Sequence, residues 1–154
     1  MKLAIANDHR GYEAKRRLLP VVKKLGHEIE DFGCEGQSAV DYPDYAAPVA
    51  RAVASGSADV GILMDGSGIG MSIAANKFCG VRAALVHDEV TALRAREHNQ
   101  CNVLCLGTDL LSEDQIRQIV EIFLSTGFAD GRHLKRIEKL AQIEREQKGG
   151  EKRE

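Results

Sequence analysis

Short apolar runs of β-type residues alternate along this chain with longer stretches of helical period. Five of these runs are predicted to be strands, at residues 2–6, 28–32, 60–64, 81–86 and 102–106. Such an alternation is typical of βαβ units, because two parallel strands need a crossover segment between them and that segment is usually a helix. The sequence therefore predicts an α/β fold built on a parallel sheet.

Helix boundaries are marked at two places. Apolar residues share one face of the first helical segment, which Gly26 is expected to end, and Pro20 within it implies a kink or a restart. Later in the chain, Ser112 and Gln115 have the spacing of a capping box, and they precede an apolar helical pattern that Gly127 is expected to close. A further amphipathic helix is predicted over residues 132–147.

The length of the chain limits the number of domains. With 154 residues, 44% of them hydrophobic, it can bury one ordinary core without disulfides or metals. We expect a single domain over residues 1–147, followed by a polar, disordered tail over residues 148–154. No internal repeat or long linker divides it.

Charge and cysteine content exclude several classes of protein. The formal charge is 21 − 23 = −2 with no long run of one sign, which disfavours nucleic-acid and anionic-membrane partners. The apolar run at residues 3–6 is too short for a signal peptide or a membrane span, so we expect a cytoplasmic protein. Its four cysteines form no C-x-x-C pair, which predicts buried, reduced thiols rather than a disulfide framework or a structural metal.

Chemically useful side chains collect just after the predicted strands. In an open parallel sheet, ligands bind outside the carboxyl ends of the strands. The segments at those positions are Asn7-Asp8-His9, Asp65-Gly66-Ser67-Gly68-Ile69-Gly70, His87-Asp88 and Gly107-Thr108-Asp109. The convergence of acid, imidazole and glycine at one rim is suited to acid–base chemistry on an anionic ligand.

Each of these features also has a purely structural interpretation. The glycine-rich turn is either an anion nest or simply a tight turn, and its spacing matches neither a Walker loop nor a full dinucleotide fingerprint. An aspartate at a helix start is more often a cap than a catalyst, and a single histidine is more often a surface residue. Arg132 and Arg136 are four residues apart on a helix, a spacing that suits either the binding of one anion or a solvated face. The other residues with such alternatives are Asp8, Asp65, His9, His87 and His98.

Several motifs together resemble a known family. They are Asp8-His9-x-Gly11, Asp41-Tyr42-Pro43, the glycine-rich turn followed by Ser72-Ile73-Ala74-Ala75-Asn76-Lys77, Arg96-Glu97-His98-Asn99 with Asn102-Val103-Leu104, and Gly131-Arg132-His133 with Arg136. From the first strand to about residue 144, the sequence is similar to ribose-5-phosphate isomerase B and its galactose-6-phosphate isomerase relatives.

The resemblance implies a fold, an assembly and a reaction. The fold would be a Rossmann-like three-layer sandwich with a five-stranded parallel sheet and an extra C-terminal helix. The assembly would be a homodimer or homotetramer with active sites shared between subunits. The reaction would be aldose–ketose isomerisation through an enediolate, as in the pentose phosphate pathway, without metal or cofactor.

The resemblance also assigns roles to individual residues. His98 and Ser67 would assist ring opening, and a base after the third strand, here Asp65, would move the proton between C2 and C1. Substrate-binding positions would be Asp8 near the sugar hydroxyls; Gly66, Gly68, Ile69, Gly70 and Asn99 around the enediolate; and His9, Arg132 and Arg136 at the phosphate.

Three positions depart from the family pattern. Many members carry a cysteine base at the position of Asp65, another branch carries a glutamate at the position of Met71, and a phosphate-binding arginine is replaced here by Asp109. The resemblance as a whole implies an isomerase of ribose 5-phosphate and ribulose 5-phosphate, and these departures leave the identity of the substrate open. The alternatives are an isomerase of another phosphorylated tetrose, hexose or deoxysugar, and a non-catalytic phosphosugar-binding protein.

Overall fold

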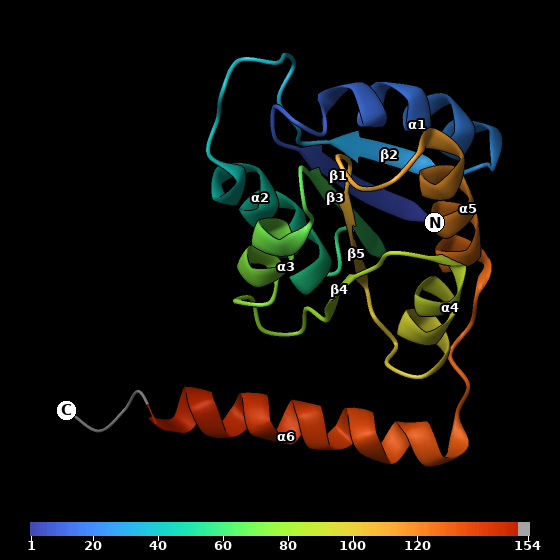
Figure 1. The fold of residues 1–154 in the computed structure, drawn as a ribbon. Coiled ribbons are helices and arrows are strands. Elements are labelled where there is room, and N and C mark those ends of the chain that lie inside the picture. The colour runs from blue at the N-terminus through green and yellow to red at the C-terminus, as the bar shows by residue number, and fades with distance from the viewer. Residues whose placement is uncertain (151–154) are drawn as a thin grey trace.

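The computed structural model describes the backbone of residues 1–150 and the side chains of residues 1–148. Strands and helices alternate along the chain, as Figure 1 shows. In chain order the elements are β1 Lys2–Asn7, α1 Tyr12–Lys24, β2 Glu28–Asp31, α2 Tyr42–Ala54, β3 Val60–Asp65, α3 Ile69–Ala75, β4 Ala83–Leu85, α4 Glu89–Glu97, β5 Val103–Gly107, α5 Glu113–Ser125, the 3₁₀ turn η1 Gly131–His133 and α6 Leu134–Gly150.

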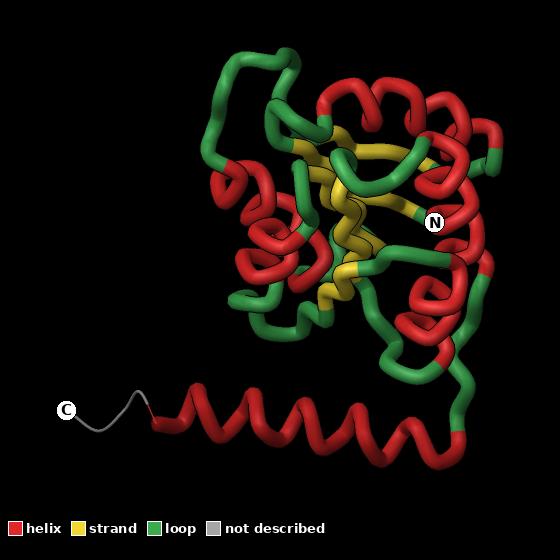
Figure 2. The backbone as a smooth tube through the Cα atoms, viewed as in Figure 1, coloured by secondary structure: helices red, strands yellow, loops and turns green. Residues whose placement is uncertain are grey.

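The five strands form one sheet in the order β2-β1-β3-β5-β4, and every pair is parallel. The predicted α/β fold is confirmed, and each predicted strand is present. The fourth strand is shorter than predicted, because the N–H of Arg82 bonds the side chain of Asn102 at 2.8 Å and the ladder begins only at Ala83. Figure 2 shows the strands in the centre with helices on both sides.

Helices cover the two faces of the sheet in separate layers. Leu3 and Ile5 of β1 face a core shared with α1, α4 and α5, whereas Ala4 and Ala6 face a core shared with α2 and α3. This alternation follows from the two-residue period of a strand. Complete burial of each such leucine or isoleucine is worth about 1.5–3 kcal/mol. The three-layer arrangement expected from the resemblance is therefore present.

The helix-end predictions have mixed outcomes. Ser112 and Gln115 do form a reciprocal capping box at the start of α5. Gly127 directly follows the C-cap residue Thr126, as predicted for a closing glycine, but it lacks the positive φ of such a glycine, because the chain turns to extended backbone at Thr126. The helix α1 does not restart at Pro20 but runs through it, at the cost of the hydrogen bond that a proline nitrogen lacks.

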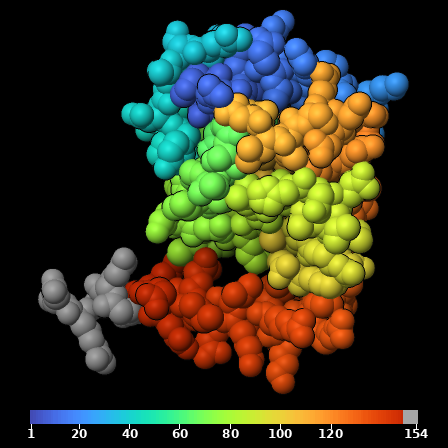
Figure 3. Space-filling view, viewed as in Figure 1, coloured from blue at the N-terminus to red at the C-terminus, as the bar shows by residue number. Residues whose placement is uncertain are grey.

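The C-terminal helix α6 forms a separate ridge against the sandwich (Figure 3). It begins after η1 and continues to Gly150, past the predicted domain boundary at residue 147, and residues 151–154 lie outside the described residues. A hydrogen bond of 2.7 Å from the N–H of Gly80 to Glu144 joins it to the rest of the chain. Leu140 and Ile143 are 47% and 55% exposed, which leaves apolar surface on this helix. Within the described residues, no helix is long and apolar enough to cross a membrane.

Candidate active site

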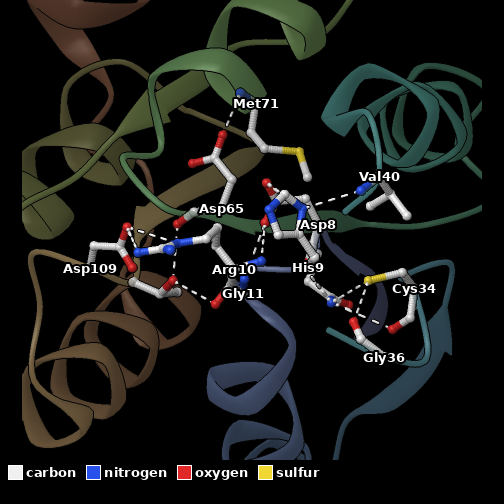
Figure 4. A network of polar contacts seen from close by, with 12 residues as sticks. Asp8, His9, Arg10, Gly11, Cys34, Gly36, Val40, Asp65, Met71 and Asp109 are labelled. Carbon is white, nitrogen blue, oxygen red and sulfur yellow. Dashed lines mark hydrogen bonds and ion pairs between the residues drawn. The ribbon is translucent and has the colours of Figure 1, made fainter. Parts of the chain in front are cut away.

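The carboxyl ends of β1, β3 and β5 lie side by side and carry the polar loops predicted from the sequence. The register pairs Asn7 with Met64 and Asp65 with Gly107, so the β1, β3 and β5 loops leave the sheet at the same edge. The connections from β1 and β3 lead to opposite sides of the sheet, which makes the gap between them a topological switch point. Figure 4 shows the residues that meet at this edge.

Asp8 is the innermost group of the β1–α1 loop and is only 6% exposed. Its Oδ1 accepts hydrogen bonds from the backbone N–H groups of Arg10, at 2.8 Å, and of Gly11, at 3.1 Å. These bonds fix the loop and hold the carboxylate ahead of α1. Oδ2 takes no part in either bond and lies 3.9 Å from Nδ1 of His9. Oδ1 of Asp8 therefore stabilises the loop, while Oδ2 is available as a hydrogen-bond acceptor.

His9 is oriented by the long loop between β2 and α2. Its Nδ1 accepts a hydrogen bond of 3.3 Å from the backbone N–H of Val40 (Figure 4). A backbone N–H can only donate, so in the neutral form of this imidazole the proton sits on Nε2. Nε2–H is a donor suited to a phosphate oxygen, in agreement with the role that the resemblance implies for His9.

Asp65 ends β3 and is 4% exposed. One carboxylate oxygen accepts the N–H of Gly68, and the other accepts the N–H of Met71 at 3.2 Å. Burial raises the pKa of this carboxyl group, with a smaller contribution from the charge of Asp8, while the backbone hydrogen bonds act in the opposite direction. The side chain thus caps α3 and is also a buried carboxylate of increased basicity.

The glycine-rich turn does bind an anion, and that anion is the chain's own carboxylate. Gly68 has φ +78°, which L side chains rarely adopt, and a Cβ there would also crowd Leu85 and the backbone of Gly107, so glycine is favoured at this position. The hydroxyl of Ser67 accepts the N–H of Ile69 at 3.3 Å, which closes the first turn of α3. A substrate oxyanion would therefore share the amide groups of this turn with Asp65.

The second group of predicted residues lies at the opposite edge of the sheet. Helix α4 runs back from the carboxyl edge, so its last turn places His98 and Asn99 at the amino edge. Arg82, directly before β4, donates to the carbonyl oxygen of Asn99 at 3.2 Å. His98 and Asp65 therefore do not meet within a single chain, because a crossover helix returns to the start of the next strand.

Arg132 and Arg136 belong to this second group. Between them His133, 6% exposed, stacks on His98 with ring centroids 4.1 Å apart and planes 13° from parallel. Burial lowers the pKa of His133, and the positive charges of His98, Arg132 and Arg136 lower it further. The chain thus carries two clusters of candidate site residues, one acidic and glycine-rich, the other rich in arginine and histidine.

Asp109 has a partner that sequence reasoning missed. Its carboxylate accepts hydrogen bonds from the guanidinium of Arg10, at 2.7 Å and 3.1 Å. The two residues are 99 positions apart, and no local pattern indicates their contact. Asp109 therefore does not stand alone as a negative charge in the site.

The cysteines are thiols, and three of the four are buried, as predicted. Cys105 lies on β5, and burial and the charge of Asp65 raise its pKa well above the ordinary value. It is therefore not a thiolate near neutral pH and is not a substitute for Asp65 as a base. Among residues 1–148, no group of three or more His, Cys, Asp and Glu side chains is arranged to hold a metal ion.

Comparison with known proteins identifies the family. A model of the family described as Ribose/Galactose Isomerase matches residues 3–140. The chain belongs to the ribose/galactose isomerase family. Ribose-5-phosphate isomerase B of Escherichia coli is 39% identical to this family member over 143 residues, covering 93% of this chain and 96% of the relative.

Solved structures of the family have the same fold. Ribose-5-phosphate isomerase B of Clostridium thermocellum has a TM-score of 0.92 and 44% identity, covering 95% of this chain and 99% of that one. The enzyme of Mycoplasma genitalium, solved with bound ribulose-5-phosphate, has a TM-score of 0.91 and 40% identity, covering 94% and 97%. The Rossmann-like sandwich of this ribose/galactose isomerase family member thus extends over nearly all of each relative.

Proposed function

We propose that this member of the ribose/galactose isomerase family interconverts ribose 5-phosphate and ribulose 5-phosphate through an enediolate. The observation that carries the proposal is the buried carboxylate of Asp65, at the carboxyl edge of the sheet and at the head of α3. The relative of Mycoplasma genitalium was solved with bound ribulose-5-phosphate, which supports the choice of this sugar pair.

The isomerisation needs a base that moves a proton between C2 and C1 and an environment that stabilises the enediolate. Asp65 is the base in this proposal. Because burial raises its pKa, the carboxylate is more basic than an exposed aspartate while it is still ionised near neutral pH. The amides at the start of α3, which already hold Asp65, supply hydrogen bonds and the positive end of a short helix to the developing oxyanion.

Completion of the site requires a second copy of the chain. Asp65 and the group around His98, Arg132 and Arg136 lie at opposite edges of the sheet, too far apart to share a sugar phosphate within one subunit. We propose a homodimer, or a tetramer of two such dimers, in which one subunit gives Asp65 and its partner gives the arginines. Ile69 and Ile73 of α3 are 52% and 54% exposed beside Asp65, which suits an apolar contact between subunits.

Within such a dimer, His98 and Ser67 assist ring opening, Asn99 contacts the enediolate, and Arg132 and Arg136 bind the phosphate with His9. Arginine guanidinium groups match phosphate oxygens in geometry and charge. The contact between subunits also excludes water from the reacting carbons. The expected cytoplasmic location remains part of the proposal.

Two observations favour other functions. The hydrogen bonds from Gly68 and Met71 to Asp65 are those of a helix cap, which favours a non-catalytic phosphosugar-binding protein. Asp109, at a position where family members carry a phosphate-binding arginine, favours a substrate other than a pentose phosphate, such as a phosphorylated tetrose, hexose or deoxysugar.

One experiment distinguishes these three functions. The purified protein is incubated with a panel of aldose and ketose phosphates, and interconversion and binding are both measured. Ribose 5-phosphate is expected to give the highest kcat/KM. Turnover of another sugar only would replace the substrate, and binding without any turnover would support the non-catalytic alternative.

A further inference from the structure

Arg10 projects from the β1–α1 loop toward Asp109 of the β5–α5 loop (Figure 4). Its Nε and Nη2 both donate to Oδ2 of Asp109, at 3.1 Å and 2.7 Å. The pair passes over the turn after β3 at Gly66, where a Cβ would lie 2.8 Å from Oδ2 of Asp109. The absence of a side chain at Gly66 therefore makes room for this ion pair at the rim of the site.

Hydrogen bonds also fix the backbone of Arg10. Its N–H donates to Oδ1 of Asp8 at 2.8 Å, and its carbonyl oxygen accepts the hydroxyl of Thr108 at 3.2 Å. The side chain is nevertheless 56% exposed. Arg10 is thus an exposed guanidinium whose orientation is fixed in advance, so a ligand that binds it loses less conformational entropy than at a free arginine.

One edge of this guanidinium remains available. Asp109 uses the edge formed by Nε and Nη2, and within residues 1–148 Nη1 has no hydrogen-bond partner. The edge formed by Nη1 and Nη2 presents two parallel N–H groups, which match two oxygens of a phosphate. Because Asp109 occupies a different edge of the guanidinium, an anion there would lie farther from the Asp109 carboxylate than from Arg10, so the attraction to Arg10 exceeds the repulsion by Asp109.

The carboxylates around Arg10 repel an anion, so a phosphate at this edge of the sheet needs a cation close to it. Asp8, Asp65 and Asp109 are all carboxylates on the same edge of the sheet, and Arg10 is the guanidinium placed among them. A phosphorylated ligand near these groups needs a cation from the same subunit in addition to those of the partner.

We propose that Arg10 is a phosphate-binding residue of the substrate site and that Asp109 is the positioning residue that orients it. This inference rests on the proposed function and deepens it, because it names a phosphate contact supplied by the subunit that carries Asp65. In this proposal the carboxylate of Asp109 serves a phosphate site indirectly, because it orients the guanidinium that binds the phosphate.

The first test removes the guanidinium. Arg10→Ala is expected to raise both the KM for ribose 5-phosphate and the inhibition constant of inorganic phosphate about tenfold or more, with kcat within about threefold. The matched control is Arg17→Ala, which removes a similarly exposed ion pair, 2.8 Å from Glu113. An unchanged KM and inhibition constant in Arg10→Ala would overturn the assignment.

The second test separates positioning from repulsion. If Asp109 orients Arg10, Asp109→Asn weakens the binding of inorganic phosphate; if Asp109 only repels anions, the same variant tightens it. Weaker binding supports the proposal and tighter binding contradicts it. Calorimetry with inorganic phosphate gives this result even if the wild-type protein isomerises no pentose phosphate, so failure of the proposed function remains distinguishable from failure of this inference.

Discussion

The imidazole rings of His98 and His133 stack almost in parallel, 4.1 Å apart, at the edge of the sheet opposite Asp65. This contact joins the end of α4 to the start of α6, and it places Arg132 and Arg136 next to His98. In the proposed dimer, the stack is part of the half-site that lacks Asp65. Two predictions concern this half-site, and two concern Asp65.

Mixed dimers test the shared site. One subunit carries Asp65→Asn, and the other carries both Arg132→Ala and Arg136→Ala, each with its own affinity tag. Either parent dimer is expected to be nearly inactive, whereas the purified heterodimer regains about half of the wild-type activity, because one of its two sites is intact. If the heterodimer is no more active than the two parent homodimers, the arginines and Asp65 do not form one active site across the subunit contact.

Acid is expected to destabilise the His133 half-site. Burial lowers the pKa of His133 below 6.5, so between its folded and unfolded pKa values the unfolded chain binds a proton that the folded chain does not. The stability contributed by neutral His133 is thus present above pH 6.5 and decreases as pH falls below it. His133→Asn should flatten this part of the curve of unfolding free energy against pH, measured by urea denaturation, while the exposed control His87→Asn should not. If the unfolding free energy depends on pH in the same way in both variants, the loss of stability in acid does not come from His133.

Much of the fold is predictable because the local signals are strong. The five strands follow from short β-type runs, and the capping box at Ser112 and Gln115 is a purely local arrangement. Gly127 indicates where α5 ends to within two residues, but not how, because extended backbone at Thr126 rather than a left-handed glycine ends the helix. The uninterrupted helix through Pro20 depends on packing of the flanking apolar residues, which no single position reveals.

The site was predictable only in part. The rule that ligands bind at the carboxyl edge located Asp8, His9 and Asp65 correctly on one edge of the sheet. The same rule does not locate His98, because its position depends on the direction of α4 and not on the nearest strand. The Arg10–Asp109 pair joins two loops far apart in sequence, and one sequence without side-chain positions gives no signal for it.

The pH dependence of turnover tests the basicity of Asp65. Because burial raises its pKa, kcat/KM should fall with acidification at a pH above the value of about 3.9 typical of an aspartate. Asp65→Cys should move this acidic limb upward by several pH units, toward the thiol value of about 8.5. If the acidic limb of kcat/KM stays at the same pH in the cysteine variant, the group that titrates there is not residue 65.

The most direct test of Asp65 as the base is exchange of the C2 proton of ribose 5-phosphate with solvent deuterium in Asp65→Asn. This substitution keeps the size of the side chain and removes its basicity. We expect exchange and isomerisation to fall at least about a thousandfold, within the range attributed to general bases, while calorimetry shows phosphosugar binding within a few-fold of wild type. Exchange at the wild-type rate would show instead that Asp65 is only the cap of α3.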